Sequence, residues 1–400
     1  MNLTSSDAEK VTQADIVIVG GGMVGAALTA SLGDSQYKVL LLEQHVPKAY
    51  DASQDFDLRV SAISRASEKL LQSVGAWEGV LSKRSCIYRR MRVWEQEGQQ
   101  GTLFDAAEIQ QTHLGHIVEN RLIQLSLWER LEQLSNVEVR SPAVVKRITY
   151  VPGKSLVELA SGEKIEAQLL VGAEGANSLV RQAASISTTG WDYPTHVLVV
   201  NVTTAYEQQD ITWQRFRPTG PEAFLPLAGN HASIVWYHRP EEVARLKALD
   251  KKDLLAELYH HFPQDLGEIT NIDDVSSFPL RRQHARSYVK PGVVLVGDAA
   301  HSIHPLAGQG VNLGFADVVS LSDALKALNP EELMGGVTLA VYEQERRKAN
   351  ALMMNTMEMF ARTSRLTPAP IKFLRSAALT LADRSGPIKQ KVMKYAMGIE

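Results

Sequence analysis

A glycine-rich turn near the start of the chain constrains the fold more than any other feature. Gly20-Gly21-Gly22-Met23-Val24-Gly25 spells G-x-G-x-x-G, and the apolar residues before it predict a strand over Asp15–Val19. A helix ending at Ser31 and a second strand over Val39–Leu42 should follow. This strand–turn–helix setting, with an acid about 20 residues further on, predicts a Rossmann-like dinucleotide site.

The roles of these residues follow from the ligand. Gly20, Gly22 and Gly25 serve the tight turn, the close approach of the backbone to a pyrophosphate and the packing of helix on strand, and Glu43 would accept hydrogen bonds from the adenosine ribose. The pattern does not distinguish FAD from NAD.

The N-terminal region does not predict a signal peptide or a membrane helix. Residues 16–33 carry no charge, which invites a signal-peptide or membrane-helix interpretation, but acids dominate the flank before them and glycines interrupt the run. Residues 1–13 lack an apolar period and predict a loose tail.

A second glycine-rich loop lies near residue 300. Val293–Val296 is an apolar run after a Pro-Gly turn, so Asp298 should sit at the carboxyl end of a buried strand, where α/β sheets bind ligands. Pro305, Gly308 and Gly310 would let the backbone approach a flat ligand before a helix resumes. Alternatively, strand, loop and helix merely pack together.

A third loop repeats this arrangement. Leu169–Gly172 is an apolar strand that breaks at Glu174 and Gly175 and leads into a helix near Arg181. Three loops at strand ends of one sheet can converge on one ligand.

Composition fits an ordinary enzyme rather than a nucleic-acid-binding protein. The chain has 400 residues, 44% of them hydrophobic, and a net charge of −3, which suffices for two domains and gives no signal for nucleic acid. The single Cys86 excludes an intramolecular disulfide. The histidines show no ligand spacing, so no metal site is predicted.

The middle of the chain predicts further helices and a second sheet. Residues 57–74 predict a helix that contains Arg59, whose guanidinium could pair with a phosphate or form a surface salt bridge. Short β-like runs in 188–287 predict an antiparallel sheet with a helix over 250–262. Its aromatic residues would line an apolar tunnel or, alternatively, fill the core of the sheet; these are Trp213, Phe216, Phe224, Trp236 and Tyr237.

Together the motifs resemble a known family. G-x-G-x-x-G at 20–25, G-A-E-G-A-N-S-x-V-R at 172–181 and G-D-A-A-H-x-x-x-P-x-x-G-Q-G-x-N at 297–312 are similar to the single-component FAD aromatic hydroxylases of the para-hydroxybenzoate hydroxylase type. Over almost its full length the chain resembles their ubiquinone-biosynthesis branch. One departure is Glu174, where the family usually has Asp.

The resemblance implies a fold and an organisation. The fold would be α/β: a discontinuous Rossmann-like FAD-binding domain of residues 14–85, 106–187 and 288–345, an inserted, mostly antiparallel β-sheet substrate domain of 86–105 and 188–287, and a C-terminal helical region of 346–400. The cofactor would be FAD, contacted by the following residues: Gly20, Gly22, Gly25, Glu43, Arg59, Arg121, Glu174, Gly175, Asp298, Pro305, Gly308, Gly310 and Asn312.

The resemblance also implies a reaction. NAD(P)H would reduce FAD, O2 would add at flavin C4a, and the hydroperoxide would hydroxylate the ring of a prenylated quinol, with the loop of Pro305, Gly308, Gln309 and Gly310 facing the flavin. Another ring position or another aromatic substrate stays open, as does a flavin-binding scaffold of a quinone-synthesis protein complex.

The C-terminal region is strongly basic. Apolar residues at helical spacing lie beside the cations, around a break at Gly386-Pro387. We expect peripheral binding to the cytoplasmic face of a bacterial membrane, or else helices that cap the FAD domain with a solvated face. The basic residues are Arg362, Arg365, Lys372, Arg375, Arg384, Lys389, Lys391 and Lys394.

Overall fold

The structure, a computed structural model, describes residues 11–95, 101–263, 268–303, 310–333, 336–365 and 386–399. A parallel sheet forms its base. Its order is β17-β18-β11-β1-β2-β8, with parallel pairing from β18 through β8, and the hairpin of β9 and β10 continues from β11. The strands are β1 Val11–Val19, β2 Val39–Leu42, β8 Val137–Arg140, β9 Val145–Thr149, β10 Ser155–Leu159, β11 Lys164–Gly172, β17 Val289–Lys290 and β18 Val293–Leu295.

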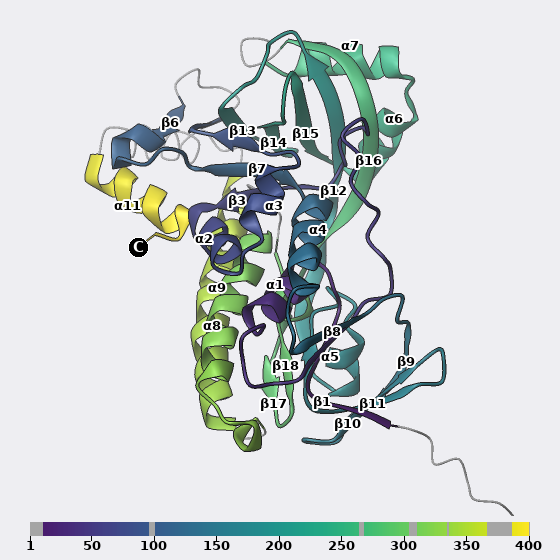
Figure 1. Cartoon of the computed structure of the whole chain (residues 1–400). Coiled ribbons are helices and arrows are strands. Elements are labelled where there is room, and N and C mark those ends of the chain that lie inside the picture. Colours follow the sequence, from purple (N-terminus) through teal and green to yellow (C-terminus); the bar gives the residue numbers. More distant parts are fainter. Residues whose placement is uncertain are drawn as a thin grey trace, which may run out of the picture.

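Helices cover this sheet because its central strands are apolar on both faces. Residues Ile16–Ile18 and Val39–Leu41 are fully buried, as parallel strands between two layers must be. Helix α1 packs on α4 and α8, and α8 runs beside α9 along one side of the molecule (Figure 1). The helices are α1 Met23–Ser31, α4 Asn120–Leu131, α5 Leu179–Ala183, α8 Gly310–Lys326 and α9 Gly336–Arg365, with a short turn η5 Pro330–Glu332.

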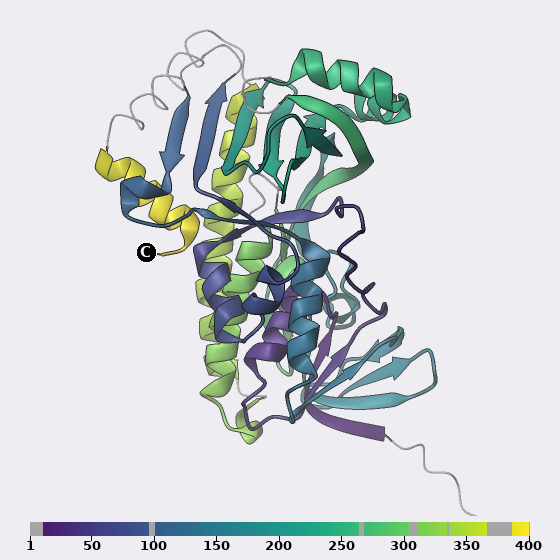
Figure 2. The ribbon, with the colours of Figure 1, turned by 45° about the horizontal axis from the view of Figure 1, so that its top comes forward.

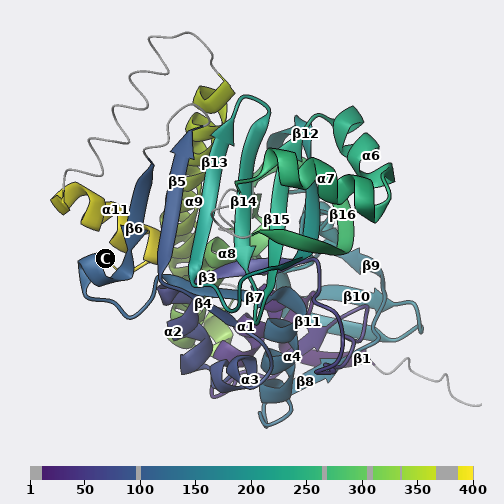
Figure 3. The same ribbon diagram turned by 90° about the horizontal axis from the view of Figure 1, so that it is seen from above.

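A second, mostly antiparallel sheet lies across the top of the first unit (Figures 1 and 3). Its order is β19-β16-β12-β15-β14-β13-β5-β6, and helices α6 and α7 lie on its outer side. The elements are β5 Arg90–Glu95, β6 Thr102–Asp105, β12 Thr188–Thr204, β13 Ile211–Arg217, β14 Gly220–Pro226, β15 His231–His238, β16 Ile269–Ala285, β19 His301–Ser302, α6 Pro240–Ala248 and α7 Lys251–His261. The predicted fold class is confirmed; the exact domain boundaries stay a proposal.

A small sheet between these units corrects one prediction. Residues 60–64, predicted as the start of a helix, form strand β3, which pairs with β7. The helix starts only at Arg65, where Ser64 caps it by accepting the amide of Ser67. The elements are β3 Val60–Ser64, β4 Cys86–Tyr88, β7 Gly115–Glu119, α2 Arg65–Ser73, α3 Trp77–Leu81 and η1 Ala106–Ile109.

The N-terminal prediction was also partly wrong. Residues Val11–Gln13, predicted as loose tail, extend β1 and pair with Lys164–Glu166 of β11. The parallel partner strand supplies backbone hydrogen bonds here, and the polar sequence alone does not predict this pairing.

The C-terminal helix α11 (Gly386–Met397) docks beside β6 and η1 (Figure 2). Met393 and Met397 are buried, and the ammonium of Lys389 pairs with Glu108 at 2.8 Å. Val392 and Tyr395, two of the apolar residues at helical spacing in this basic region, are 52% and 53% exposed, because residues 389, 393 and 397 face the protein instead. The other predicted amphipathic segment lies in 366–385, outside the described residues.

No helix among the described ranges combines the length and the apolar character needed to cross a membrane.

Candidate active site

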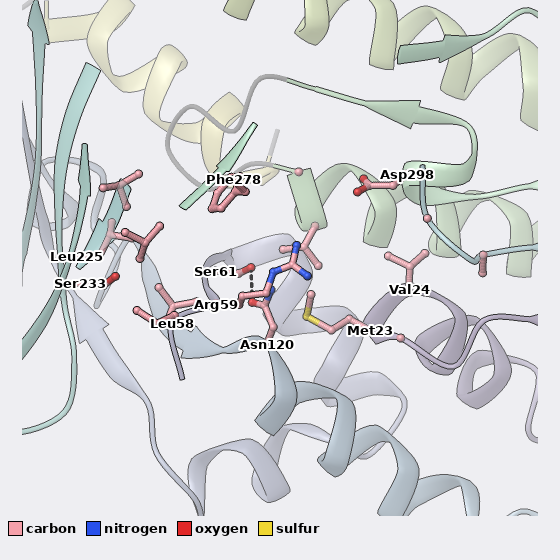
Figure 4. A pocket seen from close by; sticks show the side chains of 18 of the residues that line it. Met23, Val24, Leu58, Arg59, Ser61, Asn120, Leu225, Ser233, Phe278 and Asp298 are labelled. Carbon is pink, nitrogen blue, oxygen red and sulfur yellow. Dashed lines mark hydrogen bonds between the residues drawn. The ribbon is translucent and has the colours of Figure 1, made fainter. Parts of the chain in front are cut away.

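A cavity of about 400 Å³ opens where the carboxyl ends of the parallel strands meet the small sheet and the second sheet (Figure 4). Its residues come from both halves of the molecule, so one continuous space joins the glycine loops to the inner face of the second sheet. It is lined by Gly22, Met23, Val24, Leu58, Arg59, Val60, Ser61, Asn120, Ala173, Gly175, Val199, Leu225, Ser233, Val235, Tyr237, Phe278, Val296, Asp298, Gly310 and Val311.

Three glycines form a cradle in this cavity. A Cβ atom built on Gly22, Gly175 or Gly310 would meet no atom within 4 Å, so each would project into the cavity. Gly175 also has a φ of +83°, which favours glycine. Backbone from three separate loops therefore carries no side chain where a flat or phosphate-bearing ligand would lie. The residues present fit the dinucleotide cofactor that the sequence predicts.

The other two glycines of the N-terminal motif serve packing. Gly20 has a φ of +104°, and a Cβ there would lie 2.5 Å from the carbonyl oxygen of Ala173. A Cβ on Gly25 would lie 1.9 Å from the carbonyl oxygen of Gly20. A side chain at Gly25 would push the helix off the turn, and one at Gly20 would clash with the backbone that follows β11.

Asp298 and Arg59 both line the cavity, and their contacts with FAD stay predictions. Asp298 follows β18 in the short turn η3 Gly297–Ala299. Desolvation raises the pKa of the Asp298 carboxyl, while His301 and the guanidinium of Arg59 act in the opposite direction. A carboxylate held open to the cavity in this way can accept hydrogen bonds from ligand hydroxyls.

Glu43 and Arg121 lie outside the lining. The carboxylate of Glu43 accepts the Gly21 amide at 2.6 Å and the His45 amide at 2.9 Å, which places it directly behind the first glycine loop. The guanidinium of Arg121 pairs with Asp57 at 2.8 Å and donates to two carbonyls of residues 48–49. Arg121 thus anchors the segment that leads to Arg59; ligand contacts by Glu43 and Arg121 stay predictions.

The side chain of Glu174 turns away from the cavity towards the start of α5, the helix that follows it. Its carboxylate accepts the Ser178 hydroxyl at 2.6 Å and the Val180 amide at 2.9 Å. Burial raises its pKa, and these hydrogen bonds oppose that rise. The extra methylene relative to Asp lets Glu174 reach the start of α5, and Gly175 beside it is the residue left facing the cavity.

The start of α8 is fixed by Asn312. Its amide oxygen accepts the Ser64 amide at 3.0 Å and the Ser67 hydroxyl at 2.7 Å, and its amide nitrogen donates to Ala62. These bonds hold Gly310 in the cavity wall. Pro305, Gly308 and Gln309 lie outside the described residues.

The second sheet supplies an apolar side to the cavity. Leu225, Val235 and Phe278 line it, together with Tyr237 from the predicted aromatic set. Along an antiparallel strand the side chains alternate, so the neighbours of these residues face the other way. Phe216 is half-buried and does not line the cavity; Trp213, Phe224 and Trp236 pack with α6 and α7 in the outer core. These three residues therefore fill the core of the sheet, the second of the two predicted alternatives, and do not line the cavity.

A buried ionic network behind the loop at residue 298 was not predicted. Asp317 of α8 is fully buried and accepts the Gly297 amide at 3.1 Å and the guanidinium of Arg346 at 2.9 Å, and it also pairs with His301. Burial opposes ionisation, but these partners lower the pKa of Asp317. Helical spacing marks Asp317 only as a polar residue on a mostly apolar helix, which hints at an internal partner.

A second buried cluster was also missed. Glu68, His113 and His116 bring ligand-type atoms within 4.8 Å of one another. The guanidinium of Arg65 donates to Glu68 at 2.6 Å and also contacts His113, so a cation already sits at this carboxylate. The three residues come from α2 and from segments more than 40 positions away, so sequence spacing could not reveal them.

Comparison with known proteins decides the family. The family described as "FAD binding domain" matches residues 13–356. The chain is 41% identical over 387 residues to a 3-demethoxyubiquinol 3-hydroxylase of Escherichia coli, covering 96% of this chain and 98% of that protein. This chain belongs to the FAD-dependent hydroxylase family. The predicted family, its ubiquinone branch and the FAD cofactor are confirmed.

Other relatives agree. The chain is 33% identical over 443 residues to a mitochondrial ubiquinone biosynthesis monooxygenase of Homo sapiens, covering 98% of this chain and 94% of that one. A crystal structure of a p-nitrophenol 4-monooxygenase from Pseudomonas putida matches with a TM-score of 0.79 over 97% of this chain and 99% of that chain, at 17% identity. The latter likeness supports the fold alone.

Proposed function

We propose that this protein hydroxylates the ring of a prenylated benzoquinol in ubiquinone biosynthesis, using FAD, NAD(P)H and O2. The observation that carries the proposal is the continuity of the cavity, which joins the glycine cradle to the apolar face of the second sheet. An aromatic ring in the apolar part would lie against a flavin in the cradle. The similarity to named ubiquinone hydroxylases supports the choice of substrate class.

Bound FAD supplies hydride acceptance and oxygen activation. The backbone at Gly22, Gly175 and Gly310 would hold the cofactor, and the carboxylate of Asp298 would accept hydrogen bonds from its hydroxyls. Leu225, Val235 and Phe278 exclude water from the substrate side.

The test is product formation by the FAD-loaded protein. A short-chain demethoxy-benzoquinol, O2 and either NADPH or NADH are supplied, and the products are analysed by mass spectrometry. A gain of one oxygen atom on the ring supports the proposal, and the better nucleotide identifies the reductant. Flavin that no nucleotide reduces would contradict it and favour a scaffold role in a quinone-synthesis complex.

We further propose that α11 brings the protein to an anionic membrane surface, where a prenylated substrate would be found. Val392 and Tyr395 are half-exposed next to Lys391 and Lys394, a basic and apolar combination that suits lipid headgroups. Sedimentation with anionic liposomes should fall with salt and fall further in a variant that carries Val392→Ser and Tyr395→Ser. Equal, negligible pelleting with anionic and neutral liposomes would contradict this location.

A further inference from the structure

Two buried side-chain oxygens without a hydrogen-bond partner among the described residues belong to paired positions on neighbouring strands, and one of them, on Ser233, lies in the cavity wall. Along β15, Ile234 and Trp236 enter the outer core, whereas Ser233, Val235 and Tyr237 line the cavity. Ser233 is fully buried, and its hydroxyl has no hydrogen-bond partner among the described residues. Native structures rarely leave a buried hydroxyl unpaired, so this atom calls for a ligand group.

The second oxygen belongs to Asn201 of β12. Asn201 lies directly opposite Ser233 in the antiparallel register, so both side chains stand on the same face of the sheet, about 5 Å apart at their Cβ atoms. Its amide nitrogen donates to the carbonyls of Phe56 at 3.0 Å and Asp57 at 3.3 Å. These bonds settle which end of the amide is which, and they leave Oδ1 as a buried acceptor with no partner among the described residues.

The chemistry of the pair defines its ligand. The serine hydroxyl can donate or accept, whereas an amide oxygen only accepts. A single group that satisfies both atoms must donate to Asn201 and can either accept from or donate to Ser233; a hydroxyl does this, whereas a carbonyl or an ether has no proton for Asn201.

We propose that Ser233 and Asn201 form a hydroxyl-binding subsite that holds one ring hydroxyl of the quinol and discriminates against the oxidised quinone. The inference rests on the proposed function and adds redox-state selectivity to it. A quinone carbonyl could accept from Ser233, but it would face the Asn201 oxygen with no proton between them. Figure 4 shows Ser233 beside Leu225, at the end of the cavity away from Asp298.

The position of the subsite fits a ring held between sheet and flavin. Leu225 is the half-buried cross-strand neighbour of Ser233 on β14 and also lines the cavity, so the subsite requires that a ligand displace a neighbouring side chain such as this one to reach the covered hydroxyl. Asn201 meanwhile holds the carbonyls of residues 56–57, just before Leu58 and Arg59 in the cavity wall. The subsite thereby joins the substrate floor to the segment that carries Arg59.

The experiment is an anaerobic titration of the FAD-loaded protein with a short-chain benzoquinol and with its oxidised quinone, followed by the flavin absorbance. We expect the quinol to bind roughly tenfold more tightly. Ser233→Ala should weaken quinol binding about three- to tenfold without lowering thermal stability, because the hydroxyl it removes has no partner among the described residues. Ser155→Ala removes a buried serine hydroxyl outside the cavity and is the matched control.

A second variant tests the acceptor. Asn201→Leu should bring the affinities for quinol and quinone together; its FAD content is checked because Asn201 also holds residues 56–57. Equal binding of quinol and quinone by the unmodified protein would overturn the subsite alone. Unchanged affinity in Ser233→Ala, as a water bridging the pair would produce, would also overturn it. Binding of neither species would overturn the proposed function and the subsite together.

Discussion

Replacing Asp317 by Ala should destabilise the protein severely, because the buried ionic network behind the loop at residue 298 depends on this one carboxylate. It is fully buried and accepts from Gly297, Arg346 and Asn350 besides pairing with His301. Arg346 is 8% exposed, so the substitution leaves a buried cation without its counter-charge. Breaking a buried ion pair from one side costs about 3–5 kcal/mol.

That loss is a large part of the total free energy of unfolding of a typical protein, about 5–15 kcal/mol. The assay is urea denaturation, followed by tryptophan fluorescence, of the unmodified protein and the Asp317→Ala variant, with FAD content measured in parallel. FAD retention should also fall, because the Gly297 amide that Asp317 holds directly precedes Asp298.

The control removes both charges. A double variant with Asp317→Leu and Arg346→Leu removes both members of the Asp317–Arg346 ion pair and should recover part of the lost free energy of unfolding. An Asp317→Ala protein within about 1 kcal/mol of the unmodified one would refute the reasoning, since the carboxylate would then contribute no more than a surface ion pair.

Three further outcomes are expected. Asp298→Ala should weaken FAD binding by about 1.5–3 kcal/mol, roughly tenfold to a hundredfold, with an unchanged circular dichroism spectrum; full yellow cofactor content after purification would contradict this. Gly310→Val should abolish turnover, because its side chain would enter the cavity, and near-normal activity would show the cradle to be misplaced. Burial lowers the pKa of His284 to about 4, so the unfolded state takes up the proton first and stability should fall as the pH drops from about 6.5 towards 4; His284→Gln should flatten that part of the urea-midpoint profile, and an identical profile would contradict it.

The cofactor half of the site could be predicted because its signals are local. A G-x-G-x-x-G turn needs glycine at Gly25 because helix and turn meet there within one strand–turn–helix unit, and the structure has that close approach between Gly25 and the Gly20 carbonyl. Asp298 likewise follows its strand by position in the sequence, and it faces the cavity.

The substrate half could not be predicted because it depends on the register between strands. A strand sends alternate residues to opposite faces, and the sequence does not say which face meets the cavity. Of the predicted aromatic residues, Trp213, Phe224 and Trp236 lie in the outer core, whereas Tyr237 lines the cavity together with Ser233 and Val235, which were not predicted.

Long-range pairing explains the remaining misses. Residues 60–64 form a short apolar run that suits helix or strand, and only pairing with β7 makes them a strand. Asp317 and Arg346 lie on different helices, so no local pattern connects them.

The most direct test of the central claim is incorporation of oxygen from ¹⁸O2. The FAD-loaded protein is mixed with NAD(P)H, a short-chain benzoquinol and ¹⁸O2, and the product is analysed by mass spectrometry. A monooxygenase places one ¹⁸O atom in the new ring hydroxyl for each molecule of product, and we predict that result. Oxidation of NAD(P)H that yields only hydrogen peroxide, or a ring oxygen that derives from water, would contradict it.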